Sequence, residues 1–413
     1  MEYLFCLSYY LYALYIYKKE KDFLHPIFLF CLFWAFINSL VVLNFFDFYY
    51  PSDNVFILSF VGCSSFFASF ILYNSDNFKK NFFTKNKEHF LRKKLLDILL
   101  IITIIYMLYR LCLTLNLIFD GKSLDYIRRL SLGYNNSLVA NKVFYLYNSF
   151  INKTLIELVF PIIGCIELGK NRNYKYLLCS LFLMILNTAC TGGRFSLYYF
   201  IIIFTYTVLI YYDNLKDFIK KNFKIIILIL SFVIVLLIFF TILRSSTSFL
   251  THFCTYFSGA FYNLSVRLEN LNENFSHTYG ASSFLGVFRT IFVFTDNLNI
   301  LPYPEWFNYV VDISSVENFI KLSDTIKFNG YVTPIYSFYL DGGFIGVIIG
   351  FFSSGFISSI IYNKYKNNKD PLLFAWLLVI ILGIFTSMVV FPFTRQNFVI
   401  SIILFRVLFK KKA

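Results

Sequence analysis

Long apolar runs separated by short polar connections dominate the chain. A run near twenty residues is the length at which a helix crosses a bilayer core of about 30 Å. The pattern predicts an all-α polytopic membrane protein with about 11 transmembrane helices, in a single transmembrane domain over residues 1–413. The predicted spans are near 3–17, 26–46, 55–74, 95–119, 143–168, 176–190, 195–212, 225–243, 335–362, 372–391 and 398–409.

One connection, residues 244–334, is far longer than the rest and mixes apolar with polar segments. Within it, residues 253–275 place apolar side chains at helical spacing, which predicts an amphipathic helix on the membrane surface. These side chains are Phe257, Phe261, Leu264, Leu268 and Leu271. Pro302 and Pro304 interrupt the later part of the loop.

Basic residues sort the connections into two alternating sets. Six connections, near 18–22, 79–94, 169–175, 213–224, 363–369 and 410–413, hold 23 Lys and Arg residues. The other five contain many more residues but hold only 11 Lys and Arg. The positive-inside rule places the first set in the cytoplasm. This predicts an external N-terminus, a cytoplasmic C-terminus and an external loop at 244–334.

Composition narrows the class of protein further. The chain is 58% hydrophobic and only 15% charged, against roughly 25% charged in ordinary soluble domains. The net charge of +14 comes largely from cytoplasmic lysines facing anionic lipids, and no basic domain of the kind that binds nucleic acid is seen. The eight cysteines form no CxxC pair or Cys/His cluster, and no phosphate-binding GxxxxGK[ST] loop exists. No metal, cofactor or nucleotide is therefore predicted.

The arginines are distributed differently from the lysines. Seven of the 11 arginines, but only four of the 26 lysines, fall in the predicted external connections. These arginines are Arg128, Arg129, Arg194, Arg244, Arg267, Arg289 and Arg395. A guanidinium is a planar fork that grips phosphate at two points, so the set predicts a phosphate-bearing lipid headgroup as ligand. Alternatively, Arg194 and Arg244 simply snorkel from span ends, and Arg128 with Arg129 is a solvated pair.

Proton-transfer candidates lie in the same external loop. His252 and His277 can accept a proton from a sugar hydroxyl, and Glu269 and Asp296 are further candidate bases. The alternative for either histidine is a polar side chain at the membrane interface without a catalytic role. Inside the predicted spans, Arg110 and Lys153 are exceptional charges that either snorkel or pair.

Two segments resemble one family. The turn Thr191-Gly192-Gly193-Arg194 resembles the Gly-Arg turn of O-antigen and capsular polysaccharide polymerases, the Wzy-type oligosaccharide repeat-unit polymerases. The run from Asn329 through Thr333 to Tyr339-Leu340-Asp341-Gly342-Gly343 resembles the segment that ends their large periplasmic loop. The resemblance covers roughly residues 180–410 and includes the order of these parts along the chain.

The resemblance implies a metal-independent membrane glycosyltransferase of the bacterial inner membrane, with a periplasmic N-terminus. Such an enzyme polymerises undecaprenyl-diphosphate-linked repeat units into O-antigen or capsular polysaccharide on the outer face of that membrane. The acceptor's sugar hydroxyl attacks the anomeric carbon of the donor glycan, and the lipid diphosphate leaves. The implied partners are the lipid-linked donor and acceptor, membrane lipids and a chain-length regulator.

The sequence and the resemblance together give two sets of candidate residues. The candidate catalytic residues are Arg194, Arg244, Arg289, His252, His277 and Asp341. The candidate substrate-binding residues are Arg267, Arg395, Gly192, Gly193, Asn329, Thr333 and Tyr339. The arginines would stabilise the charge developing on the diphosphate, and the histidines or Asp341 would take or position the acceptor proton. For Asp341 a helix N-cap is the alternative.

Other functions remain open at this point. The nearest is a ligase that transfers the glycan to a lipid A core by the same chemistry. A lipid-linked oligosaccharide flippase would have twelve or more spans, short outer loops and charges facing a central cavity. A structural membrane protein without catalysis is a further alternative.

Overall fold

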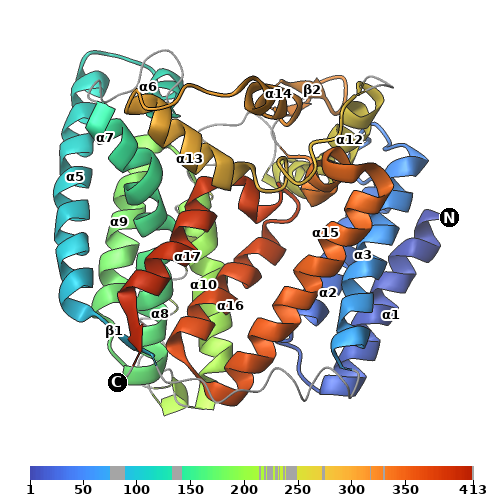
Figure 1. Ribbon diagram of the computed structural model, residues 1–413, viewed down its shortest axis with the longest axis horizontal. Coiled ribbons are helices and arrows are strands. Elements are labelled where there is room, and N and C mark those ends of the chain that lie inside the picture. The colour runs from blue at the N-terminus through green and yellow to red at the C-terminus, as the bar shows by residue number, and fades with distance from the viewer. Residues whose placement is uncertain are drawn as a thin grey trace. The chain divides into compact units, whose positions relative to one another are not determined.

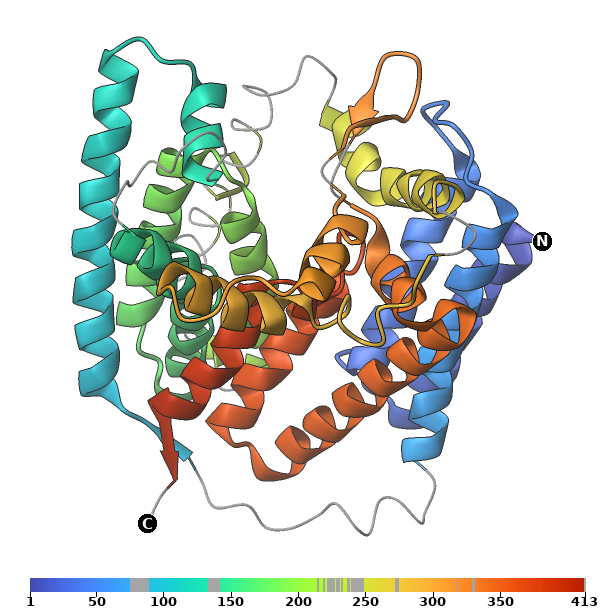
Figure 2. The same cartoon turned by 45° about the horizontal axis from the view of Figure 1, so that its top comes forward.

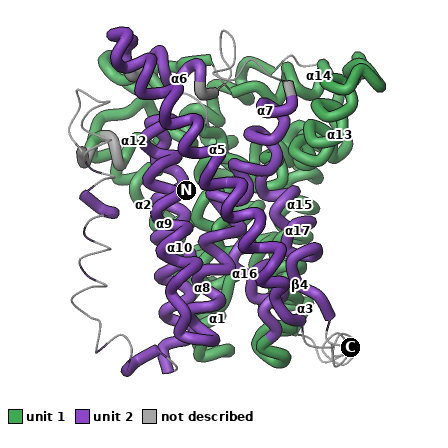
Figure 3. Tube along the Cα trace, turned by 90° about the vertical axis from the view of Figure 1, so that its left-hand side faces the viewer, with its two compact units in different colours: residues 1–86, 247–369, 380–396 green, residues 87–246, 370–379, 397–413 purple. Residues whose placement is uncertain are grey.

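The computed structural model describes residues 1–74, 89–132, 142–213, 249–271, 275–316, 318–328 and 331–411, with scattered residues between 215 and 238. The chain divides into two compact units, shown in different colours in Figure 3. Unit 1 comprises residues 1–86, 247–369 and 380–396, and unit 2 comprises residues 87–246, 370–379 and 397–413. Helices make up most of the described chain, with short strands paired in two antiparallel ribbons.

Five helical segments in the described residues are long and apolar enough to cross a membrane. They are α2 (Pro26–Leu43), α3 (Asp53–Tyr73), α5 (Lys93–Phe119), the segment Val143–Asn171 and α15 (Thr333–Asn368). Four shorter apolar helices are α9 (Lys175–Thr191), α10 (Phe195–Ile210), α16 (Pro371–Phe385) and α17 (Gln396–Leu408). The chain is therefore a helical membrane protein. The predicted span 225–243 lies largely outside the described residues.

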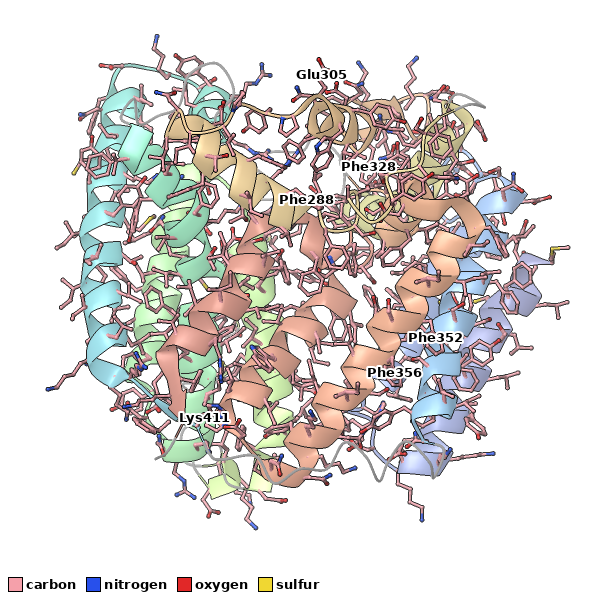
Figure 4. The ribbon with its side chains drawn as sticks, viewed as in Figure 1. Phe288, Glu305, Phe328, Phe352, Phe356 and Lys411 are labelled. Carbon is pink, nitrogen blue, oxygen red and sulfur yellow. The ribbon has the colours of Figure 1, made fainter. Side chains whose placement is uncertain are left out.

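Small residues let the long helices of unit 1 pack closely. Helix α1 (Glu2–Glu20) packs on α2, and α3 packs along α15 (Figure 1). A Cβ atom at Gly355 of α15 would lie 2.8 Å from the Phe66 carbonyl oxygen of α3, and one at Gly62 would lie 2.7 Å from the Phe351 ring. Such close approach gives dispersion contacts that larger side chains would prevent. In the same stretch of α15, the labelled rings of Phe352 and Phe356 are stacked (Figure 4).

Helix α15 is interrupted where two glycines follow each other. Gly342 (φ −169°, ψ 32°) and Gly343 (φ 58°, ψ −140°) are not helical, so two helical segments meet there. Gly343 has a positive φ that side chains disfavour. The predicted span 335–362 thus corresponds to a longer helix with a break near its start.

The described part of region 249–332 of unit 1 contains three helices and a short ribbon. It contains α12 (Phe249–Glu269), α13 (Leu285–Asn297) and α14 (Glu305–Ile313), followed by the ribbon β2 (Ile320–Lys321) and β3 (Lys327–Phe328), as Figure 2 shows. The amphipathic helix expected within 253–275 is present as α12. Its apolar face packs on protein and not on lipid, because Phe261 is fully buried against Trp34 of α2 and Phe56 of α3.

Unit 2 contains α5, α6 (Leu124–Leu132), the segment from α7 (Lys142–Leu146) to α8 (Phe160–Asn171), α9 and α10. Between α7 and α8 the chain forms two π-helical stretches, Tyr147–Asn152 and Leu155–Val159. The ribbon of β1 (His89–Leu91) and β4 (Phe409–Lys411) also belongs to this unit. The His89 Nδ1 atom lies 2.8 Å from Asp370 Oδ2, which ties this ribbon to the start of α16.

Candidate functional site

The loop between α12 and α13 lies against the break in α15. Two backbone hydrogen bonds join them, from the Thr278 N–H to the Leu340 carbonyl oxygen (2.9 Å) and from the Tyr279 N–H to the Asp341 carbonyl oxygen (3.2 Å). Gly280, with a φ of 95°, turns the chain away towards α13. The loop 275–284 and the Gly342–Gly343 break therefore form one structural site within unit 1.

The carboxylate of Asp341 holds this loop in place. Its Oδ1 accepts hydrogen bonds from the Thr278 hydroxyl (2.5 Å) and the Ser282 N–H (3.0 Å), and its Oδ2 accepts one from the Ser283 N–H (3.0 Å). Charge-assisted bonds of this kind are about twice as strong as neutral ones. Because both oxygens are engaged, Asp341 here positions the loop that leads into α13.

Helix α14 supports the other side of the loop. Phe307 and Val310 of α14 are buried against Ala281 and Leu285. The Tyr309 hydroxyl donates to the Ser276 carbonyl oxygen (2.9 Å) and accepts from the Ser276 N–H (3.1 Å). Figure 4 labels Phe288 of α13 and Glu305 at the start of α14, and the Phe288 ring meets Trp306 edge-on at 5.4 Å.

His277 is exposed and lies directly over the break. Its Nδ1 is 3.3 Å from the Leu340 carbonyl oxygen, and its Cε1 would be 3.5 Å from a Cβ added to Gly343. The ring also meets Phe275 edge-on at 5.0 Å. If Nδ1 carries the proton and donates to Leu340, Nε2 is the ring nitrogen that can accept one.

Helix α13, which carries the candidate Arg289, packs on the turn that leads to the candidate Arg395. A Cβ at Gly286 would lie 2.6 Å from the Phe393 carbonyl oxygen and 2.8 Å from that of Arg395, so α13 sits on the short 3₁₀ turn Pro392–Thr394. Arg289 follows Gly286 by three residues, hence on the same face of α13 and about 4.5 Å further along the axis. Arg289 and Arg395 are both half-buried. The structure thus brings Asp341 and His277 together at the loop before α13, and it places Arg289 and Arg395 where α13 packs on the Pro392–Thr394 turn of the same unit.

Three other predicted residues of unit 1 have structural contacts. The Arg267 guanidinium of α12 donates to the Asn263 side-chain oxygen (3.3 Å) and the Asn318 carbonyl oxygen (2.7 Å). Thr333 is buried, and its hydroxyl accepts from the Ile335 N–H (3.3 Å) at the start of α15. The Tyr339 ring stacks on Phe275 at 6.2 Å, which places it beside His277.

The predicted Gly-Arg turn lies in unit 2, between α9 and α10. Gly192 ends α9 with a φ of 61°, and its N–H donates to the Thr188 carbonyl oxygen (2.8 Å). The Gly193 N–H donates to the Thr191 hydroxyl oxygen (3.1 Å). Arg194 follows as the half-buried N-cap residue of α10. The turn is tight and well braced, as its two glycines predict.

Three predicted site residues cannot be located in full. Arg244 and Asn329 lie outside the described residues, and His252 falls in α12 with its side chain outside them. Among the residues that the structure describes, no group of three His, Cys, Asp or Glu side chains could hold a metal ion.

The sequence pattern did not identify the loop residues that bind the Asp341 carboxylate. Thr278, Ser282 and Ser283 supply every hydrogen bond to the Asp341 carboxylate in the described structure. One local signal for them existed: Ser282 and Ser283 directly precede an apolar run, as residues before a helix commonly do. Nothing local shows that their partner is Asp341, which is 58 and 59 residues away.

These observations define a helical membrane protein with an exposed histidine over a broken helix, and with two half-buried arginines where α13 packs on the turn before α17. No family model, curated protein or solved structure matches the chain.

Proposed function

We propose that the protein is a membrane glycosyltransferase that polymerises undecaprenyl-diphosphate-linked repeat units. It would act on the outer face of the bacterial inner membrane, with eleven spans, an external N-terminus and a cytoplasmic C-terminus. The observation that carries the proposal is the exposed His277, held over the Gly342–Gly343 break in the loop that leads into α13. Helix α13 carries Arg289 and packs on the turn before Arg395. The resemblance of the Thr191–Arg194 turn and of the segment ending at Gly343 to the polymerase family supports it.

In this proposal His277 takes the proton from the acceptor's sugar hydroxyl. The exposed imidazole is accessible to a substrate, whereas both oxygens of Asp341 already accept hydrogen bonds from the loop. Asp341 then acts as a positioning residue, since it fixes Thr278, the neighbour of His277. General-base catalysis of this kind contributes roughly 10²- to 10⁴-fold to rate.

Arg289 and Arg395 stabilise the negative charge on the departing lipid diphosphate. A guanidinium donates two parallel hydrogen bonds to phosphate oxygens, and its charge does not depend on pH. One preorganised hydrogen-bond donor aimed at developing charge is worth about 10²- to 10³-fold in rate. As the acceptor oxygen bonds to the anomeric carbon, the bond from that carbon to the diphosphate oxygen breaks.

The test is surface glycan analysed on a gel, from a strain that lacks the gene and carries one variant at a time. His277→Gln and Arg289→Gln should remove the polymer ladder while single repeat units still reach their acceptor. Arg129→Gln is the matched control, because Arg129 is an exposed arginine of α6 in the other unit, and its ladder should stay within twofold of wild type. Unchanged ladders with His277→Gln and Arg289→Gln at equal protein level would refute the assignment.

A further inference from the structure

A charged side chain is buried inside unit 2. Arg110 of α5 is only 3% exposed, and its Nη1 donates to the Asn148 side-chain oxygen (2.9 Å). Its Nε has no hydrogen-bond partner among the described residues, and no described carboxylate forms an ion pair with it. A charge inside a membrane protein is expensive and usually has a function. Water can satisfy the Nε–H but cannot neutralise the charge.

Two neighbouring polar groups are also unsatisfied. The Asn148 side-chain oxygen accepts a second hydrogen bond from the Asn152 amide nitrogen (3.2 Å), which leaves the buried Asn152 side-chain oxygen without a partner in the described structure. The buried Tyr106 hydroxyl, one turn before Arg110 on α5, is likewise unpartnered among the described residues. The cluster therefore has two hydrogen-bond donors and one acceptor to offer a ligand.

The two asparagines lie on a π-helical stretch, Tyr147–Asn152. Such stretches are uncommon and are frequently found at functional sites. The Tyr147 ring packs edge-on against Tyr106 at 5.0 Å, which joins this stretch to α5. The irregular backbone and the unsatisfied side chains thus coincide.

The cluster lies next to the Gly-Arg turn of the same unit. Helix α5 packs on α9, and Arg110 and Thr114 of α5 lie close enough to Cys190 of α9 to act on its thiol. Cys190 immediately precedes the turn Thr191–Arg194. Asn116 is a polar residue near the end of α5, six residues after Arg110. Along the helix axis the two residues are therefore about 9 Å apart.

We propose that Arg110, Tyr106, Asn148 and Asn152 form a second phosphate-binding site, beside the Arg194 turn, for the phosphate ester of a sugar. Phosphate oxygens accept hydrogen bonds from the Arg110 Nε–H and the Tyr106 hydroxyl. A neighbouring sugar hydroxyl donates to the Asn152 side-chain oxygen. The phosphate neutralises the buried guanidinium. Assigning this phosphate to a lipid-linked glycan rests on the proposed function, whereas the site itself rests on unit 2 alone.

Calorimetric titration of the purified full chain in detergent tests the site, with farnesyl diphosphate and inorganic pyrophosphate as probes at constant ionic strength. We expect Arg110→Gln to weaken binding of at least one probe about tenfold and Tyr106→Phe to weaken it about threefold. Lys153→Gln is the matched control, since Lys153 is an exposed cation on the same segment as the asparagines, and should change the affinity less than twofold.

Thermal unfolding of the ligand-free variants separates binding from a structural role. Tyr106→Phe removes an unsatisfied buried hydroxyl, and Arg110→Gln removes an unneutralised buried charge while keeping an amide that can donate to Asn148. Neither variant should therefore lower the ligand-free unfolding temperature. Wild-type affinity in both variants, or no binding of either probe by the wild-type protein, would overturn the proposal. Should Arg110→Gln fail to fold, Tyr106→Phe decides alone, because it removes only one oxygen atom.

The two probes distinguish the source of the phosphate. Binding of farnesyl diphosphate alone indicates a lipid-linked ligand, and equal binding of pyrophosphate indicates recognition of the phosphate itself. If Arg110→Gln loses affinity but the wild-type protein forms no polymer, the phosphate-binding site is supported and the polymerase function is refuted. If the wild-type protein forms polymer and Arg110→Gln binds the probes as wild type does, the polymerase function is supported and the phosphate-binding site is refuted.

Discussion

At the scale of single residues, the Asp341 carboxylate is the most heavily engaged group of the candidate site. Three donors hold it, two of them backbone N–H groups of the loop before α13. A side chain bound in this way contributes mainly by fixing geometry. The exposed His277, one residue from Thr278, is the group whose position it fixes.

Asp341→Asn tests this role. The amide nitrogen would face an N–H group in place of a carboxylate oxygen, so we expect the free energy of unfolding to fall by about 2–3 kcal/mol. Asp312→Asn, at an exposed carboxylate of α14, should change it by less than about 0.5 kcal/mol. Denaturant unfolding in mild detergent measures both. Equal stability of the two variants would mean that the three hydrogen bonds are not important for the fold.

A second residue-scale prediction concerns pH and His25, the N-cap residue of α2. Burial lowers the pKa of His25 to about 3, the negative charge of Asp22 opposes this, and Lys366 adds to it. The neutral ring is required because its Nδ1 accepts from the Ile27 N–H (3.2 Å) and cannot do so when protonated. The pKa of Asp22 is also lowered: burial raises it, but hydrogen bonds from Tyr362 and the Leu24 N–H and the charge of Lys366 outweigh burial.

The sign follows from the lowered pKa of His25. Between its folded value and the unfolded value near 6.5, only the unfolded chain binds the proton, so stability is full above pH 6.5 and is lost as the pH falls. From pH 7 to pH 5 we expect a loss of about 2 kcal/mol, whereas Asp22 contributes little in this window. His25→Asn, which keeps an N-cap acceptor, should flatten the dependence. A wild-type curve that is flat over this range would contradict the buried neutral histidine.

At the scale of elements, the break in α15 provides a matched pair of glycines. Gly343 has a positive φ, and a Cβ there would also contact the His277 ring at 3.5 Å. Gly342 has an extended φ, and a Cβ there would meet no heavy atom within 4 Å. Gly343→Ala should cost about 1–3 kcal/mol and displace His277, while Gly342→Ala should be close to neutral. The two variants should differ both in unfolding temperature and in the polymer seen on the glycan gel. The same unfolding temperature and the same polymer in both variants would exclude strain at this break.

Some elements could be predicted from the sequence and others could not. The apolar runs locate α2, α3, α5 and most of α15, because a twenty-residue apolar stretch has few other folds. The apolar face of α12 that carries Phe261 could be predicted from the sequence. Whether that face packs on lipid or on protein could not, because both surroundings are apolar. The link between Asp341 and Thr278 depends on tertiary structure across 63 residues. The π-helical stretch near Asn148 has the same apolar pattern as an ordinary helix.

At the scale of the whole molecule, the charge pattern makes a prediction about orientation. With an odd number of spans, the two ends of the chain lie on opposite sides of the membrane. Green fluorescent protein fused after Ala413 should therefore fluoresce, and alkaline phosphatase inserted at residue 299, between α13 and α14, should be active. Active phosphatase at the C-terminus would contradict both the span count and the external position of the loop.

In the proposed function, this chain alone joins lipid-linked repeat units. The most direct measurement uses the purified protein in lipid vesicles, incubated with single lipid-linked units extracted from a strain that lacks the gene. We expect a ladder of longer lipid-linked glycans and release of one undecaprenyl diphosphate for each bond formed, with neither product when His277→Gln replaces the wild type. Unchanged single units, or extension only when a lipid A core is added as acceptor, would contradict the polymerase assignment.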